Sequence, residues 1–99
     1  MKTIKISKVE IQVSGEILLC LENQHDPFYQ YIYREAAGVY WNQERAGFES
    51  RDAYKMPFEW WYLHIVSLVK ESLGVELVRT QSTKWVNVPI AVKSKIEVL

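Results

Sequence analysis

The side chains that most often do catalytic or metal chemistry are few in this sequence, and their spacing matches no known site. The two histidines, His25 and His64, and the single cysteine, Cys20, do not have the spacing of metal ligands. The four glycines are isolated, so there is no glycine-rich phosphate loop, and no serine lies in a nucleophile elbow. The sequence therefore predicts no catalytic residue, no metal site and no cofactor.

Two groups of polar residues could still be given a catalytic interpretation. His25 and Asp26 are adjacent and precede Pro27, which is more typical of an exposed turn than of a catalytic pair. A mixed charge run follows further along the chain and is typical of a solvated loop: Glu44, Arg45, Glu49, Arg51 and Asp52. A small enzyme whose Glu, His and Arg side chains come together from distant segments remains the alternative to a binding protein.

The aromatic residues are the more informative group. Twelve of the 13 aromatic residues lie between Phe28 and Tyr62, and several of them must form the core. On a helical wheel Trp60 falls opposite the apolar stripe of its segment. It begins a row that we predict to be a ligand or partner surface: Trp60, Leu63, His64, Ser67 and Glu71. The row could be covered by the chain's own segment 42–55, by a second copy or by a ligand.

The element that must position this row is a helix over residues 57–73. Pro57 suits a first helical turn, and Gly74 suits the position just after a helix. The apolar residues fall on one wide stripe at 100° per residue: Phe58, Trp61, Tyr62, Ile65, Val66, Leu68, Val69 and Leu73. A short C-terminal helix is predicted at 89–97, with Asn87 as a cap and a last strand at 96–99 as the alternative.

Strands are predicted on both sides of this helix. The apolar residues Ile4 and Ile6 stand at even positions, whereas Val9 and Ile11 stand at odd positions. This switch in the alternation indicates a bulge or two short strands. A tight hairpin at 13–16 leads to a return strand, 16–22, that is apolar on both faces and is therefore predicted to be central. Further strands are predicted at 28–33, 39–41, 75–80 and 84–88. Residues 42–55 are predicted to be an irregular connection, with a hairpin around 46–47 as the alternative.

This order of elements predicts an α+β fold. We expect one domain, residues 1–99, in which a mainly antiparallel sheet is packed by one long amphipathic helix.

Composition limits the partners and the compartment. Lys+Arg and Asp+Glu number 12 each, and the pI is about 6.7, which disfavours nucleic acid as a partner. Lys5, Lys8 and Glu10 interrupt any signal-peptide core, and no apolar run is long enough for a membrane span. Cys20 lies in an apolar run and is predicted to be a buried thiol. These features predict a cytoplasmic protein that does not bind membranes.

Three segments resemble a known group of proteins: 62–70 (YLHIVSLVK), 74–75 (GV) and 83–89 (TKWVNVP). They resemble small uncharacterised proteins that are encoded on mobile gene cassettes of bacterial integrons. The resemblance implies a small, self-contained, cytoplasmic bacterial protein, and it transfers no functional residue.

The function predicted from these observations is that of a non-enzymatic small binding or interaction protein. We expect a homodimer that recognises a small apolar ligand or a protein partner. The alternatives are the small enzyme described above and a component of a toxin–antitoxin pair.

Overall fold

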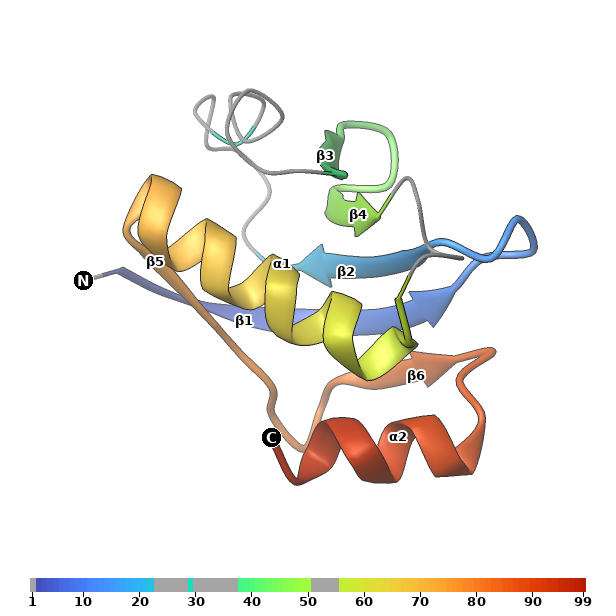
Figure 1. Ribbon diagram of the computed structural model, residues 1–99. Coiled ribbons are helices and arrows are strands. Elements are labelled where there is room, and N and C mark those ends of the chain that lie inside the picture. Colours follow the sequence, from blue (N-terminus) through green and yellow to red (C-terminus); the bar gives the residue numbers. More distant parts are fainter. Residues whose placement is uncertain (1, 23–28, 30–37, 51–55) are drawn as a thin grey trace.

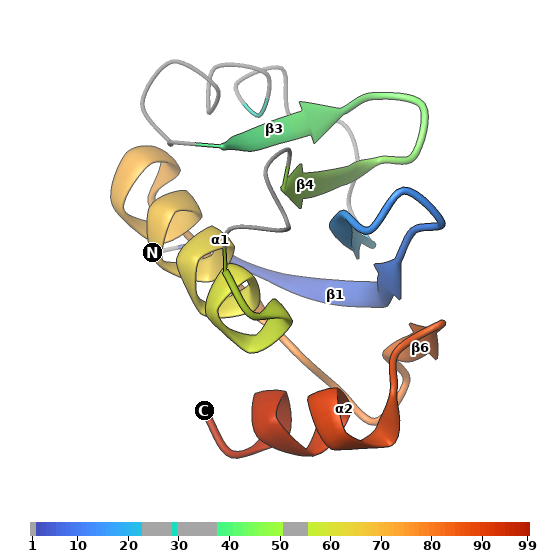
Figure 2. The ribbon, with the colours of Figure 1, turned by 45° about the vertical axis from the view of Figure 1, so that its right-hand side comes forward.

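The computed structural model describes residues 2–22, 29, 38–50 and 56–99. One curled sheet runs through it in the order β3-β4-β2-β1-β5, and β6 also pairs with β1. The strands are β1 (Lys2–Ile11), β2 (Ile17–Leu21), β3 (Val39–Asn42), β4 (Gly47–Ser50), β5 (Val75–Val78) and β6 (Lys84–Val86). Helix α1 (Phe58–Leu73) crosses one face of the sheet, and α2 (Ile90–Glu97) lies beside β6 (Figures 1 and 2). The predicted α+β class is confirmed.

The predicted mainly antiparallel sheet is confirmed, but the sheet is mixed: three of its five described strand pairings are antiparallel and two are parallel. The consecutive pairs β1–β2 and β3–β4 are antiparallel, as expected for hairpins, and β4 also pairs antiparallel with β2. On its other edge, however, β1 pairs parallel with β5 over its first half and parallel with β6 over its second half. Two strands near the C-terminal end of the sequence, β5 and β6, therefore pair with the same edge of the first strand, β1.

The apolar alternation in β1 switches at a β-bulge, which is one of the two interpretations that the sequence allowed. The register with β2 shifts between Ile6 and Lys8, so Ile6 and Val9 both face the core. The bulge lies where the partner on the other edge changes from β5 to β6. There the buried hydroxyl of Thr83 donates a hydrogen bond of 2.7 Å to the Ile6 carbonyl. This bond satisfies a backbone group that would otherwise be buried without a partner.

Strand β2 is the central strand that its composition predicts. It lies between β1 and β4, and all five of its residues are buried. Burial raises the pKa of the Cys20 thiol, although Lys8 and Arg45 act in the opposite direction. The Cys20 Sγ donates to the Arg45 carbonyl at 3.3 Å. Cys20 is thus a packed side chain rather than a reactive thiolate.

Residues 47–50 form a strand, which corrects the prediction that 42–55 is irregular. Strand β4 makes a hairpin with β3, close to the alternative placed at 46–47, and it also pairs with β2. A Cβ on Gly47 would lie 2.6 Å from the Leu19 carbonyl oxygen, so the close approach of β4 to β2 requires glycine. The predicted strand at 28–33 falls outside the described residues, apart from Tyr29.

Helix α1 matches the predicted range closely. It begins at Phe58 after Pro57 and ends before Gly74, which adopts φ 66° in the left-handed region. Its buried residues are Trp61, Tyr62, Ile65 and Val69, which all belong to the predicted stripe. This stripe packs against β5, β2 and β4 and forms the main core with the inner face of the sheet.

Helix α2 confirms the helical prediction over the alternative of a last strand. Its N-cap is Pro89, with no side-chain cap bond, so the predicted capping role of Asn87 is wrong. Asn87 instead adopts φ 58° in the turn that leads to the helix. Ile96 is fully buried and anchors α2 to the core. Neither α1 nor α2, the helices in the described parts of the chain, is long and apolar enough to cross a membrane.

Candidate functional site

The predicted row lies on the outer face of α1. Trp60 is 59% exposed and Leu63 is 41% exposed, whereas the apolar side chains on the inner face are buried or half-buried. Ser67 and Glu71 are exposed further along the helix, and His64 is half-buried with its ring 5.6 Å from that of Trp61. The wheel position therefore gives Trp60 the exposure expected of a contact surface rather than of a core residue.

A small apolar pocket lies at the N-terminal end of this row. It has a volume of about 170 Å³ and is lined by Glu59, Trp60, Leu63 and Leu99. Leu99 is 54% exposed and comes from the segment that follows α2. A 3.7 Å ion pair between Glu59 and Lys95 links α1 and α2 near this pocket. The sequence does not indicate that Leu99 lies near Trp60, because their places in one pocket depend on how α2 packs against α1.

A second pocket continues this apolar surface between α1 and β5. It has a volume of about 340 Å³ and shares Leu63 and Leu99 with the first pocket; its other lining residues are Tyr62, Val66, Leu77, Val78 and Arg79. The guanidinium carbon of Arg79 lies 5.6 Å from the centroid of the Tyr62 ring. Burial raises the pKa of the Tyr62 hydroxyl, against the effect of the nearby Arg79 charge. Tyr62 therefore stays neutral at physiological pH.

The described part of the charge run is held by structural hydrogen bonds. Arg45 pairs with Glu10, and the buried Glu49 carboxylate accepts a hydrogen bond of 2.9 Å from Gln12. Partial burial raises the pKa of Glu10, but the hydrogen bonds and positive charges of Lys8 and Arg45 outweigh it, so the pKa lies below its ordinary value. These contacts join the β1–β2 hairpin to the β3–β4 hairpin.

Other polar candidates lie outside the described residues or do not converge. His25, Asp26, Arg51 and Asp52 fall outside the described residues. Within the described ranges, no group of three or more His, Cys, Asp or Glu side chains could hold a metal ion.

The comparisons with known proteins show which family the chain belongs to. No family model matches the sequence, and no curated protein matches it. Among solved structures, the chain is similar to the integron cassette protein Hfx_Cass5 from the mobile metagenome of the North West Arm sewage outfall. The two chains are 31% identical, the match covers 97% of this chain and 93% of the other, and the TM-score is 0.46.

By this sequence identity, the protein belongs to the integron cassette proteins, which confirms the resemblance seen in segments 62–70, 74–75 and 83–89. The similarity assigns no activity, ligand or partner to this chain.

Proposed function

We propose that this integron cassette protein is a cytoplasmic, non-enzymatic interaction protein that forms a symmetric homodimer through the outer face of α1. The observation that carries the proposal is the exposure of Trp60, at 59%, beside Leu63 and Leu99. Water contact with these side chains is unfavourable, and a partner surface that covers them gains their apolar area. Tryptophan is also among the residues most enriched in the centres of protein interfaces.

The size of the adjoining pocket favours a protein surface over a small apolar ligand. Pockets that enclose small molecules usually have volumes of about 300–1,000 Å³. The pocket between α1 and β5, with about 340 Å³, falls within this range, but Trp60 does not line it. The pocket beside Trp60 has only about 170 Å³. It can receive one apolar side chain of a partner.

The spacing of the row favours a second copy as the partner. If two α1 helices pack antiparallel about a two-fold axis at Leu63 and His64, Trp60 of one copy faces Ser67 of the other. The large ring then meets a small side chain, and the same contact occurs twice. Glu71 stays at the polar rim of such an interface. The formal net charge of zero leaves no long-range repulsion between two copies.

The substitution Trp60→Glu tests the proposal. A charge at the centre of the interface should dissociate the dimer and leave a folded monomer with an unchanged circular dichroism spectrum. The matched control is Val13→Glu, because Val13 is another exposed apolar residue but lies in the turn between β1 and β2. The control should keep the mass of the wild type in analytical ultracentrifugation.

Three results would contradict a dimer formed through this face of α1. An unchanged dimer mass for Trp60→Glu would place the interface elsewhere, and an unchanged monomer mass would favour a ligand surface. A loss of several kcal/mol in stability would instead show that Trp60 is covered within its own chain, because the new carboxylate would then be buried without a partner.

A further inference from the structure

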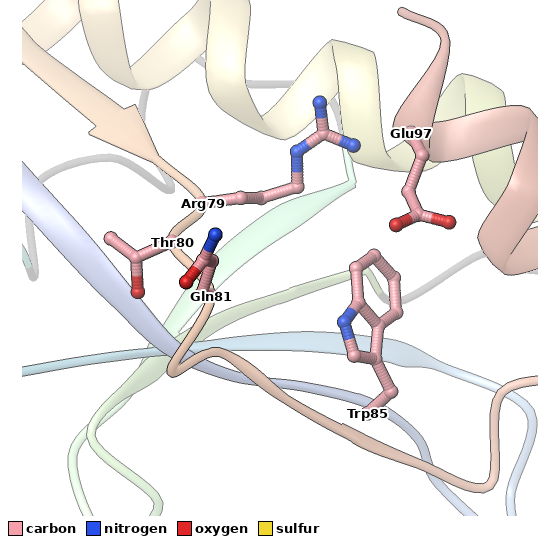
Figure 3. Close-up of a pocket in the computed structure, with 5 residues that line it drawn as sticks. All are labelled: Arg79, Thr80, Gln81, Trp85 and Glu97. Atoms are coloured by element: carbon pink, nitrogen blue, oxygen red, sulfur yellow. The ribbon is translucent and has the colours of Figure 1, made fainter.

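A third pocket lies between the end of β5, strand β6 and α2, and its lining differs in kind from the apolar surface on α1. It has a volume of about 430 Å³, within the usual range for small-molecule sites. Its lining residues are Arg79, Thr80, Gln81, Trp85 and Glu97 (Figure 3). The pocket thus combines a cation, an anion, an amide and an aromatic ring.

Arg79 is held in place before any ligand arrives. Its Nη1 donates a hydrogen bond of 2.6 Å to the Ile96 carbonyl, and its guanidinium lies over the Tyr62 ring at 5.6 Å. A guanidinium has five N–H donors. The Ile96 carbonyl is the only acceptor recorded for it among the described residues, so further donors are available to a carboxylate in the pocket.

The wall next to Arg79 is a rigid turn. The Thr80 N–H donates to the Thr83 Oγ1 at 2.9 Å, and the Thr83 N–H donates back to the Thr80 carbonyl at 3.2 Å. Thr83 is in turn fixed to β1 through its bond to Ile6. The backbone that carries Gln81 is therefore held at both ends, which reduces the entropy lost when a ligand binds.

Trp85 forms the apolar side of the pocket. It belongs to β6, where it is paired with Val9 of β1, and it is half-buried. The Lys93 ammonium lies 5.5 Å from the centroid of its ring. Figure 3 shows the ring extending toward the space between Arg79 and Glu97.

Glu97 supplies a negative charge on the other side of the pocket. It is exposed, and its carboxylate makes no hydrogen bond or ion pair with the described residues. In particular, Glu97 and Arg79 line the same pocket without pairing with each other. Two separated, opposite charges in one pocket match a ligand that itself carries both charges.

We propose that this pocket binds a free α-amino acid with an aromatic side chain. Arg79 would bind the carboxylate, Glu97 the ammonium group, and Trp85 the ring of the ligand. Thr80 and Gln81 offer further hydrogen bonds to the same polar groups. The proposal does not rest on the dimer: none of these residues belongs to the row on α1, and only Arg79 also lines the pocket that contains Leu63 and Leu99.

Isothermal titration calorimetry with L-phenylalanine tests the site on the full chain. We expect saturable binding with one ligand per chain. Two analogues each lack one charge: 3-phenylpropionate lacks the ammonium group and 2-phenylethylamine lacks the carboxylate. Each should bind at least about tenfold more weakly, because a hydrogen bond to a charged group is lost.

The variant Glu97→Gln removes the charge that recognises the ammonium group. It should weaken L-phenylalanine about tenfold and leave 3-phenylpropionate unchanged, and because Glu97 has no described partner the fold should not be affected. The matched control is Glu76→Gln, an exposed glutamate on β5 outside the pocket, which should bind as the wild type does. Absence of saturable binding, equal binding of 3-phenylpropionate by the wild type, or unchanged affinity in Glu97→Gln would each overturn the proposal.

Discussion

Replacing Ile65 with alanine is expected to lower the free energy of unfolding by about 2–5 kcal/mol. Ile65 is fully buried at the middle of the inner face of α1 and belongs to the main core cluster. Truncation removes apolar contacts and leaves a cavity between the helix and the sheet. Because small domains have only about 5–15 kcal/mol of stability, the variant should be marginally stable. Urea denaturation followed by circular dichroism, at one protein concentration, measures the change.

The matched control is the same change at Ile90. This isoleucine is 83% exposed at the start of α2, so its truncation should change the free energy of unfolding by no more than about 0.5 kcal/mol. If Ile65→Ala also changed it by less than about 1 kcal/mol, the packing of α1 on the sheet would be wrong.

Replacing Phe48 with alanine is expected to cost still more, about 3–5 kcal/mol. Phe48 is fully buried in β4, and its ring centroid lies 4.9 Å from that of Trp41 and 5.4 Å from that of Tyr29. The substitution removes a ring that two other rings contact. It also weakens a strand that pairs with both β2 and β3.

The conservative variant Phe48→Leu shows whether the loss of stability comes from the lost apolar volume or from any substitution at this position. It keeps most of the apolar area and should lose clearly less stability than Phe48→Ala in the same denaturation experiment. Equal and small losses in both variants would mean that residues 47–50 do not form part of the core, as their irregular pattern in the sequence first indicated.

The difference between the α1 and β4 predictions has a physical cause. The apolar residues of α1 follow a single helical period, and Gly74 marks the end of the helix, so the local pattern and the observed packing agree. In β4 all four residues are buried, including Glu49 and Ser50. Their polar groups are satisfied by distant partners: Ser50 accepts a hydrogen bond from the Ile17 N–H, and Glu49 accepts one from Gln12. A buried strand with polar residues shows no alternation in its sequence.

The mixed topology could not be predicted for a related reason. The bulge in β1 is local and leaves a switch in the apolar alternation that the sequence displays. The choice of β5 and β6 as parallel partners of β1 depends on contacts between residues about 70 positions apart, such as Lys2 with Val75. No local pattern in either segment records that pairing.

The candidate sites divide in the same way. The position of Trp60 and Leu63 opposite the apolar stripe follows from the period of one helix, so the sequence predicted it. Their exposure was not predicted, because the chain's own segment 42–55 remained a possible cover. Leu99 joins them only because α2 packs beside α1. The pocket of Arg79, Trp85 and Glu97 likewise gathers residues from β5, β6 and α2, whose spacing in the sequence carries no motif.

The mass of the wild-type protein in solution tests the proposed dimer most directly. Sedimentation equilibrium at tens of micromolar should give twice the chain mass of 11.7 kDa, with dissociation on dilution. A mass of 11.7 kDa at that concentration would contradict the homodimer without the need for any variant.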